Sequence, residues 1–150
     1  MEAVGQRELA VSTFNRVGEL LELSERTPEE IDEMIHAAHV SCYVWSQVGA
    51  PANVARGEWQ CARVYAILGR AEPALWHAGR CLELTEVGGE SFEDWDLPSA
   101  WQSMAHAHLA AGDTEEARRW AALAREGVAR VEDPEDRDVI EGQIEELGLT

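Results

Sequence analysis

The fold is decided by the stretch ARVYAILGRAEPALWHAGRC, residues 62–81, because its main features return 43 positions later in AHAHLAAGDTEEARRWAALA, residues 105–124. Both copies carry small residues at the same offsets around a central glycine, Gly69 in the first and Gly112 in the second. Small side chains let two helices approach closely, and a glycine suits the short turn between them. The repeated stretch therefore predicts two antiparallel helical hairpins.

Signals for helix starts and stops recur along the whole chain, and no strand-like alternation interrupts them. The run TPEE at residues 27–30 combines a capping box with proline in the first turn, and Asp113 and Asp133 begin later helices in a similar way. We expect an all-α domain of stacked antiparallel hairpins, with helices near residues 3–23, 28–48, 51–68, 71–87, 97–111, 114–130 and 134–147.

The repeated hairpin resembles the tetratricopeptide repeat (TPR), a helix–turn–helix unit of about 34 residues. The resemblance covers about residues 53–130 and places Trp101 where the family often has tryptophan. Glu58 and His108 stand where the family has a large apolar residue and an aromatic residue. The resemblance implies a TPR-like α-solenoid that binds proteins or peptides in a groove lined by the first helix of each hairpin.

The two copies are spaced 43 residues apart, nine more than the TPR unit, and the extra residues fall in the acidic segment 87–96. A connection of this length in a helical array is often functional. Its alternative role is a tethered linker whose aromatic side chains fill the space between repeats. Residues 1–50 are expected to form a divergent N-terminal hairpin, and residues 134–147 a polar capping helix. A repeat-like spacing in residues 42–49 leaves open a register in which the second helix begins a hairpin.

Acidic side chains outnumber basic ones by 29 to 12, which gives a formal net charge of −17. Such a charge repels nucleic acid and anionic lipid, and it favours cationic ligands, basic peptides or metal ions. The alternative is that the charge serves solubility alone. The three cysteines give no disulfide framework, the N-terminus lacks a secretory signal, and no apolar run is long enough to span a membrane. These features predict a cytoplasmic protein with no nucleic-acid or membrane partner.

Carrying the TPR groove over by position selects one face of the first helix in each repeat. Arg56, Trp59 and Arg63 share such a face, where two guanidiniums beside an indole suit a carboxylate or a planar group. The alternative is that these arginines pair with Glu58 or with the acidic insertion. The expected groove contains Arg56, Trp59, Arg63, Gln102 and His106, with Ser99 on the same face and Trp95 in the insertion.

His36 and His39 lie with Asp32 and Tyr43 on one stripe of the second helix, outside its two apolar rows. A His-x-x-His pair with a nearby carboxylate is compatible with zinc, iron or another divalent metal. The alternative is a solvent-facing polar stripe. Candidates for a third ligand are His77, His106, Glu58 and Asp94.

Two functions of different classes follow from these patterns. The leading hypothesis is a small TPR-like module that binds a protein or peptide and has no catalytic residues or cofactor. The alternative is a metal-dependent helical enzyme that acts on a small anionic substrate through His36, His39 and a carboxylate. The exposed ends of a short helical array also permit homodimerisation through a terminal helix.

Overall fold

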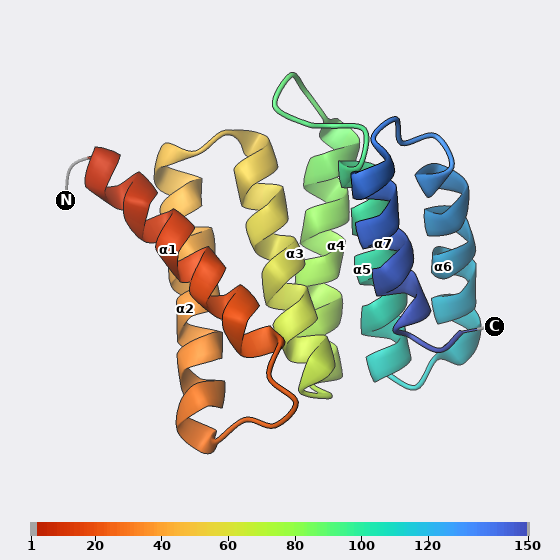
Figure 1. The fold of residues 1–150 in the computed structure, drawn as a ribbon, viewed down its shortest axis with the longest axis horizontal. Coiled ribbons are helices and arrows are strands. Elements are labelled where there is room, and N and C mark those ends of the chain that lie inside the picture. Colours follow the sequence, from red (N-terminus) through yellow and green to blue (C-terminus); the bar gives the residue numbers. More distant parts are fainter. Residues whose placement is uncertain (1–2, 150) are drawn as a thin grey trace.

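The computed structural model describes residues 3–149, and over this range the chain forms helices and their connections without a strand. The predicted all-α fold of packed hairpins is therefore confirmed (Figure 1). The helices of the described range are α1 (Ala3–Leu21), α2 (Pro28–Val48), α3 (Pro51–Ile67), α4 (Ala71–Val87), α5 (Asp96–Ala110), α6 (Thr114–Val128) and α7 (Pro134–Glu145).

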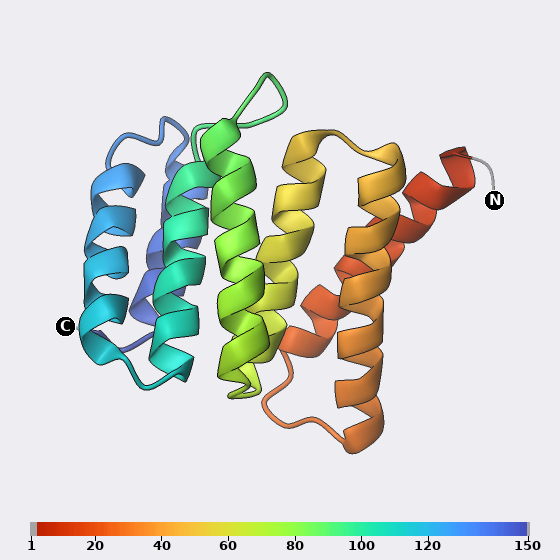
Figure 2. The same ribbon diagram turned by 180° about the vertical axis from the view of Figure 1, so that it is seen from behind.

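The helices pack as a series of hairpins. Consecutive helices pack as antiparallel pairs, and within residues 3–149 non-consecutive helices contact each other only as α1–α3, α3–α5 and α5–α7. The odd-numbered helices thus form one continuous series of contacts, called here the inner layer. In Figure 1, α1 and α7 lie in front of α2 and α5, on either side of α3, and Figure 2 shows the opposite face with α2 and α5 in front.

The helix starts follow the local signals in the sequence. The Thr27 side chain accepts a hydrogen bond from the backbone N–H of Glu30, and the Glu30 carboxylate accepts one from the N–H of Thr27. At the starts of α6 and α7, the side chains of Asp113 and Asp133 accept hydrogen bonds from the backbone N–H groups of Glu116 and Glu135. These side chains satisfy backbone donors that have no partner within the helix, so each helix begins at a residue that the sequence defines.

The helix ends differ from the predicted ones by up to two residues, and a side chain explains the end of α1. The helix stops at Leu21 instead of residue 23. The guanidinium of Arg26 donates hydrogen bonds of 2.8 Å to the carbonyl oxygens of both Leu20 and Leu21. These carbonyls face no further helical turn, so the arginine satisfies acceptors that the helix end leaves open.

Small residues permit close helix crossings, as the repeated stretch predicts. Buried alanines fill the crossings within α3/α4 and within α5/α6. Gly69 and Gly112 have φ values of 72° and 79° in the turns, a region that glycine adopts without steric cost. A Cβ atom on Gly127 would lie 2.8 Å from Pro98 Cγ and 2.9 Å from Trp101 Cζ3, so α6 approaches α5 too closely for a larger residue there.

Buried polar side chains hold α1 and α7 against the rest of the inner layer. Gln60 of α3 donates a hydrogen bond of 3.0 Å from Nε2 to the carbonyl oxygen of Phe14 in α1. Gln102 of α5 donates to the carbonyl oxygen of Gln143 in α7 at 3.4 Å. A buried amide without a partner would be costly, so these bonds favour one placement of α1 and one of α7.

The connection between α4 and α5 projects beyond the end of α4 (Figure 1) and is tied back at several points. The hydroxyl of Ser91 accepts a hydrogen bond from the backbone N–H of Ala52, and Asp94 Oδ2 accepts one of 3.0 Å from the N–H of Glu132. The predicted segment 87–96 therefore contacts both the start of α3 and the α6–α7 connection.

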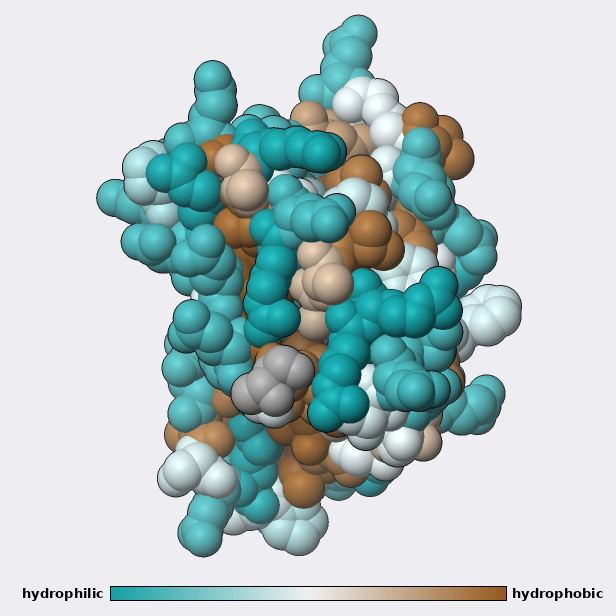
Figure 3. All heavy atoms as spheres, turned by 90° about the vertical axis from the view of Figure 1, so that its right-hand side faces the viewer, coloured by the Kyte–Doolittle hydropathy of each residue, from teal (hydrophilic) through white to brown (hydrophobic). Residues whose placement is uncertain are grey.

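The end of the molecule formed by α6 and α7 has a mostly hydrophilic surface with smaller hydrophobic areas between the polar side chains (Figure 3). Within residues 3–149, no helix combines the length and the apolar character that crossing a bilayer requires.

Candidate functional site

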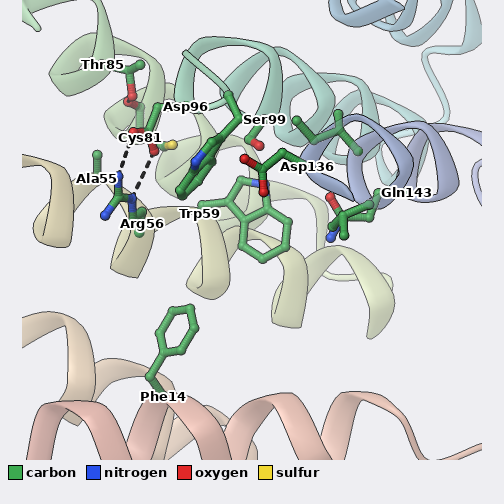
Figure 4. A pocket seen from close by; sticks show the side chains of 13 residues that line it. Phe14, Ala55, Arg56, Trp59, Cys81, Thr85, Asp96, Ser99, Asp136 and Gln143 are labelled. Carbon is green, nitrogen blue, oxygen red and sulfur yellow. Dashed lines mark hydrogen bonds and ion pairs between the residues drawn. The ribbon is translucent and has the colours of Figure 1, made fainter. Parts of the chain in front are cut away.

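A pocket of about 330 Å³ opens between α1 and α7 on the inner layer. Its walls are mainly apolar and come from elements far apart in the sequence. Figure 4 shows Phe14 of α1 across the pocket from Trp59 of α3, with Asp136 and Gln143 of α7 on the far side. Three of the six residues expected in the groove line this pocket: Arg56, Trp59 and Trp95.

The Arg56 guanidinium is held by two neighbours. It forms two hydrogen bonds with Asp96, of 3.0 Å from Nε and 2.7 Å from Nη2, and it stacks 4.5 Å from the centre of the Trp95 ring. The Asp96 side chain is 5% exposed and that of Arg56 is 29% exposed. Such a bidentate pair is among the stronger contacts that an arginine makes. Arg56 is therefore paired with Asp96, the last residue of the acidic segment 87–96. Its guanidinium is not free to bind an anionic ligand in this arrangement.

The other three residues of the expected groove, Arg63, Gln102 and His106, lie outside the pocket. Gln102 is buried under Gln143, and Arg63 forms a 3.1 Å ion pair with Glu146 just after α7. His106 lies near both members of that ion pair and is largely buried. None of the three lines the pocket. The helix α7 packs on α5, which carries Gln102 and His106, and the contact to Arg63 of α3 comes from Glu146.

Burial also determines the protonation behaviour of His106. Desolvation disfavours the charged imidazolium, and the nearby Arg63 guanidinium adds repulsion. Together they lower the pKa of His106 to about 4, although Glu146 acts in the opposite direction. His106 is therefore neutral at physiological pH.

Trp59 contributes an aromatic surface to the pocket, and its polar edge is inside the protein. Its indole N–H is buried and has no acceptor among the described residues. The Arg63 guanidinium lies 5.7 Å from the ring centre. A buried donor without a partner costs free energy, so local rearrangement that supplies an acceptor would be favourable.

Two side chains of α7, Asp136 and Val139, line the pocket and remain partly or largely accessible to solvent. Asp136 is partly exposed and forms no ion pair with any described residue, in contrast to Asp96. Val139 lines the pocket and is 59% exposed. The sequence predicts α7 as a polar capping helix and assigns it no part in binding. The signal that identifies its pocket face is the spacing of Asp136, Val139, Ile140 and Gln143, which places one stripe on one side of a helix.

A second cluster of polar side chains joins α2, α3 and α4, and it contains three of the candidate metal ligands, His39, Glu58 and His77. His39 Nε2 lies 2.8 Å from the Tyr65 hydroxyl, and His77 Nδ1 lies 2.6 Å from Glu58 Oε2. The rings of His39 and His77 are 5.3 Å apart, and the Cys42 thiol donates to Glu58 at 3.5 Å. The polar side chains of this cluster therefore form hydrogen bonds with one another, and these bonds link the three helices.

The pKa values in this cluster follow from burial and hydrogen bonding. Desolvation, followed by repulsion from His77, lowers the pKa of His39. Burial alone would raise the pKa of Glu58, but the hydrogen bond and charge of His77, the Cys42 thiol and the charge of Arg80 outweigh it and lower the value. The cluster therefore favours neutral His39 and ionised Glu58.

The metal hypothesis for His36 and His39 stays a prediction. His36 is exposed on α2, whereas His39 turns toward Tyr65 and His77. Over residues 3–149, no group of three or more His, Cys, Asp or Glu side chains is placed to hold a metal ion. The structure thus brings His39 together with His77 and Glu58, two of the suggested additional ligands, in a hydrogen-bonded cluster.

Comparison of the chain with protein-family models, with curated proteins and with solved structures gave no match.

Proposed function

We propose that this chain is a TPR-like interaction module that binds a short peptide or a partner helix in the pocket between α1 and α7. The observation that supports the proposal most strongly is the pocket itself, with its aromatic and aliphatic walls and its largely exposed Val139. Concave apolar sites with a few polar groups are the usual form of binding sites. The resemblance to TPR repeats supports a peptide as the ligand.

The size of the pocket sets the scale of the contact. A volume of about 330 Å³ is at the lower end of the range for ligand pockets, which suits one or two side chains. A smaller hollow of about 130 Å³ adjoins it, shares Phe14 and Arg56 with it, and is bounded by Trp45 and Asn53. A peptide anchored in the main pocket has room to continue along α1 toward this second hollow.

The same proposal places the module in a reducing, cytoplasmic environment. All three cysteines, Cys42, Cys61 and Cys81, are buried and free. Burial, followed by the hydrogen bond with Thr85 that acts in the opposite direction, gives the Cys81 thiol a raised pKa of about 12. A thiol of this kind reacts slowly, which suits a packing role over a redox role.

The test is selection of binders from a displayed library of random dodecapeptides on the immobilised protein, followed by calorimetry with the most enriched peptide. Ser99 lines the pocket and makes no side-chain hydrogen bond among the described residues, so Ser99→Phe should fill the pocket with little loss of helicity. The control is Ser46→Phe, at an exposed position on α2. We expect Ser99→Phe to weaken binding at least about ten-fold, because it excludes the ligand sterically.

Two results would contradict the proposal. One is a selection that enriches no peptide, and the other is a peptide that binds the Ser99→Phe protein as well as the wild type. Circular dichroism of both variants checks that the helices remain. A second matched pair, Val139→Gln in the pocket and Val40→Gln on the exposed face of α2, should separate loss of apolar contact from loss of fold.

A further inference from the structure

We infer that the pocket selects a basic peptide, in which an apolar side chain enters between Phe14, Trp59 and Val139 and an adjacent arginine or lysine meets the carboxylate of Asp136. This inference rests on the proposed function and names the chemistry of the partner. The sequence analysis, in contrast, predicts that Arg56 and Arg63 bind a carboxylate of the ligand.

The first support is the charge balance inside the pocket. Arg56 is the one cation among the described lining residues, and its guanidinium is compensated by the bidentate contact with Asp96. Arg63, just outside the pocket, is paired with Glu146. The remaining charge on the lining is Asp136, so the pocket carries an uncompensated negative charge. An anionic ligand would meet no free positive group there.

The second support is the position of Asp136 relative to the apolar walls. It lies on the same face of α7 as Val139, one turn away, and it lines the pocket together with Trp59 (Figure 4). A carboxylate beside aromatic and aliphatic walls suits a side chain with an apolar stem and a cationic end. Lysine and arginine have this form, and their stems pack on apolar surfaces while the charged group stays at the rim.

The third support is the field of the whole chain. A formal net charge of −17 attracts cationic peptides over distances comparable with the Debye length, about 10 Å at 0.1 M salt. In sequence, Glu135 and Asp138 flank Asp136 and Arg137, and the guanidinium of Arg137 donates to the carbonyl oxygens of Val131 and Glu132. Electrostatic attraction of this kind raises the association rate, and salt weakens it.

The experiment uses the peptide selected above and two variants of it, in which its basic residue next to the apolar anchor is replaced by glutamine or by glutamate. Each is titrated against the wild type, Asp136→Asn and Glu141→Gln. Glu141 is an exposed carboxylate of the same helix that does not line the pocket, so its variant is matched in charge. We expect Asp136→Asn to weaken the affinity for the basic peptide about five-fold. The affinity for the peptide variant that carries glutamine in place of the basic residue should stay unchanged.

The outcomes separate the inference from the proposed function. Enriched peptides that are neutral or acidic, yet blocked by Ser99→Phe, would overturn the inference and leave the peptide-binding module intact. The same holds if Asp136→Asn and Glu141→Gln have equal effects on the basic peptide. If no enriched peptide is blocked by Ser99→Phe, both proposals fail. Affinity for the basic peptide that falls as sodium chloride is raised, together with the Asp136-specific loss, supports the inference.

The absence of lysine from the chain allows a direct check of the contact. A lysine-containing form of the selected peptide supplies amines, so carbodiimide coupling joins that lysine to a nearby carboxylate of the protein. We expect the coupled carboxylate to be Asp136. Coupling only to carboxylates outside the pocket, with Asp136 unmodified, would contradict the assigned contact.

Discussion

Arg56 and Asp96 form a two-point ion pair that joins the middle of α3 to the first residue of α5, across the acidic connection that follows α4. The same guanidinium stacks on Trp95, the residue just before α5. One arginine therefore fixes a wall of the pocket and neutralises Asp96, a buried carboxylate of its lining. The positive charge of Arg56 therefore stabilises the fold at this wall of the pocket and is not available to bind a ligand.

Asp96→Ala should lower the free energy of unfolding by about 2–3 kcal/mol, because it leaves the Arg56 guanidinium without its partner. The value lies below that for a fully buried pair, since Arg56 remains 29% exposed. The loss also includes the hydrogen bond that Asp96 accepts from the N–H of Glu93. Urea unfolding measures the effect, and Glu90→Ala at an exposed position of the same connection is the control. Equal stabilities of the two variants would show that the ion pair does not hold the connection.

The buried His106 should make the protein less stable as the pH falls. Its pKa is about 4 in the folded chain and 6.5 in its ordinary state, so below pH 6.5 the unfolded chain binds a proton that the folded chain excludes. The stability that is present above pH 6.5 is therefore lost progressively down to about pH 4. A difference of this size corresponds to about 3 kcal/mol in total.

The measurement is urea unfolding between pH 7 and pH 4.5 for the wild type and His106→Gln. The variant should lose less stability over this range, whatever its stability at pH 7. His36→Gln, at an exposed position of α2, controls for removal of a histidine. Parallel pH profiles for wild type and His106→Gln would show that His106 is not shielded as the structure indicates. Glu58 affects a lower range, because its lowered pKa removes stability only below about pH 4.5.

Two glycines in helices should respond to alanine with opposite signs. A Cβ atom on Gly127 would lie under 3.0 Å from Pro98 and Trp101, so Gly127→Ala forces α5 and α6 apart and should cost about 1–3 kcal/mol. A Cβ atom on Gly79 of α4 has no neighbour within 4 Å, so Gly79→Ala should stabilise the protein by up to about 1 kcal/mol. Thermal unfolding of the two variants tests the close crossing, and equal shifts would contradict it.

The local parts of this fold could be predicted from the sequence. Helix starts depend on residues next to one another, such as the Thr27–Glu30 capping box and the Asp113 and Asp133 caps, and these lie where expected. The pattern of small residues likewise identified the close crossings inside the hairpins. Helix ends are harder to predict from neighbouring residues. The end of α1, for example, depends on Arg26, which lies beyond the helix and donates hydrogen bonds to the carbonyl oxygens of Leu20 and Leu21.

The candidate site could be predicted only in part, because it depends on where the terminal helices pack. Arg56, Trp59 and Trp95 line the pocket, whereas the placement of α7 joins Gln102 to Gln143 and Arg63 to Glu146 outside it. That placement is set by contacts between residues more than 40 positions apart, such as the hydrogen bond from Gln102 to Gln143. For the same reason, the sequence alone does not place a face of α7 at the pocket or pair His39 with Tyr65.

The metal hypothesis has a direct check in elemental analysis of the chain purified without chelator. We expect no stoichiometric divalent metal, because His39 and Glu58 engage Tyr65 and His77 in hydrogen bonds and His36 is exposed. Near-stoichiometric zinc, iron, manganese or nickel that is lost in His36→Ala or His39→Ala would favour the enzyme alternative.

The most direct test of the peptide-binding pocket uses the six tryptophans as reporters, since each gives one indole N–H signal in a ¹H–¹⁵N correlation spectrum. Single Trp→Phe variants assign the signals, and the peptide enriched from the dodecapeptide library is then titrated in. We expect the signals of Trp59 and Trp95, which line the pocket, to shift with peptide concentration, while that of Trp76, which is largely exposed on α4, stays in place. Shifts confined to Trp76 or Trp120, with Trp59 and Trp95 unchanged, would show that the ligand binds elsewhere and would contradict the proposed function.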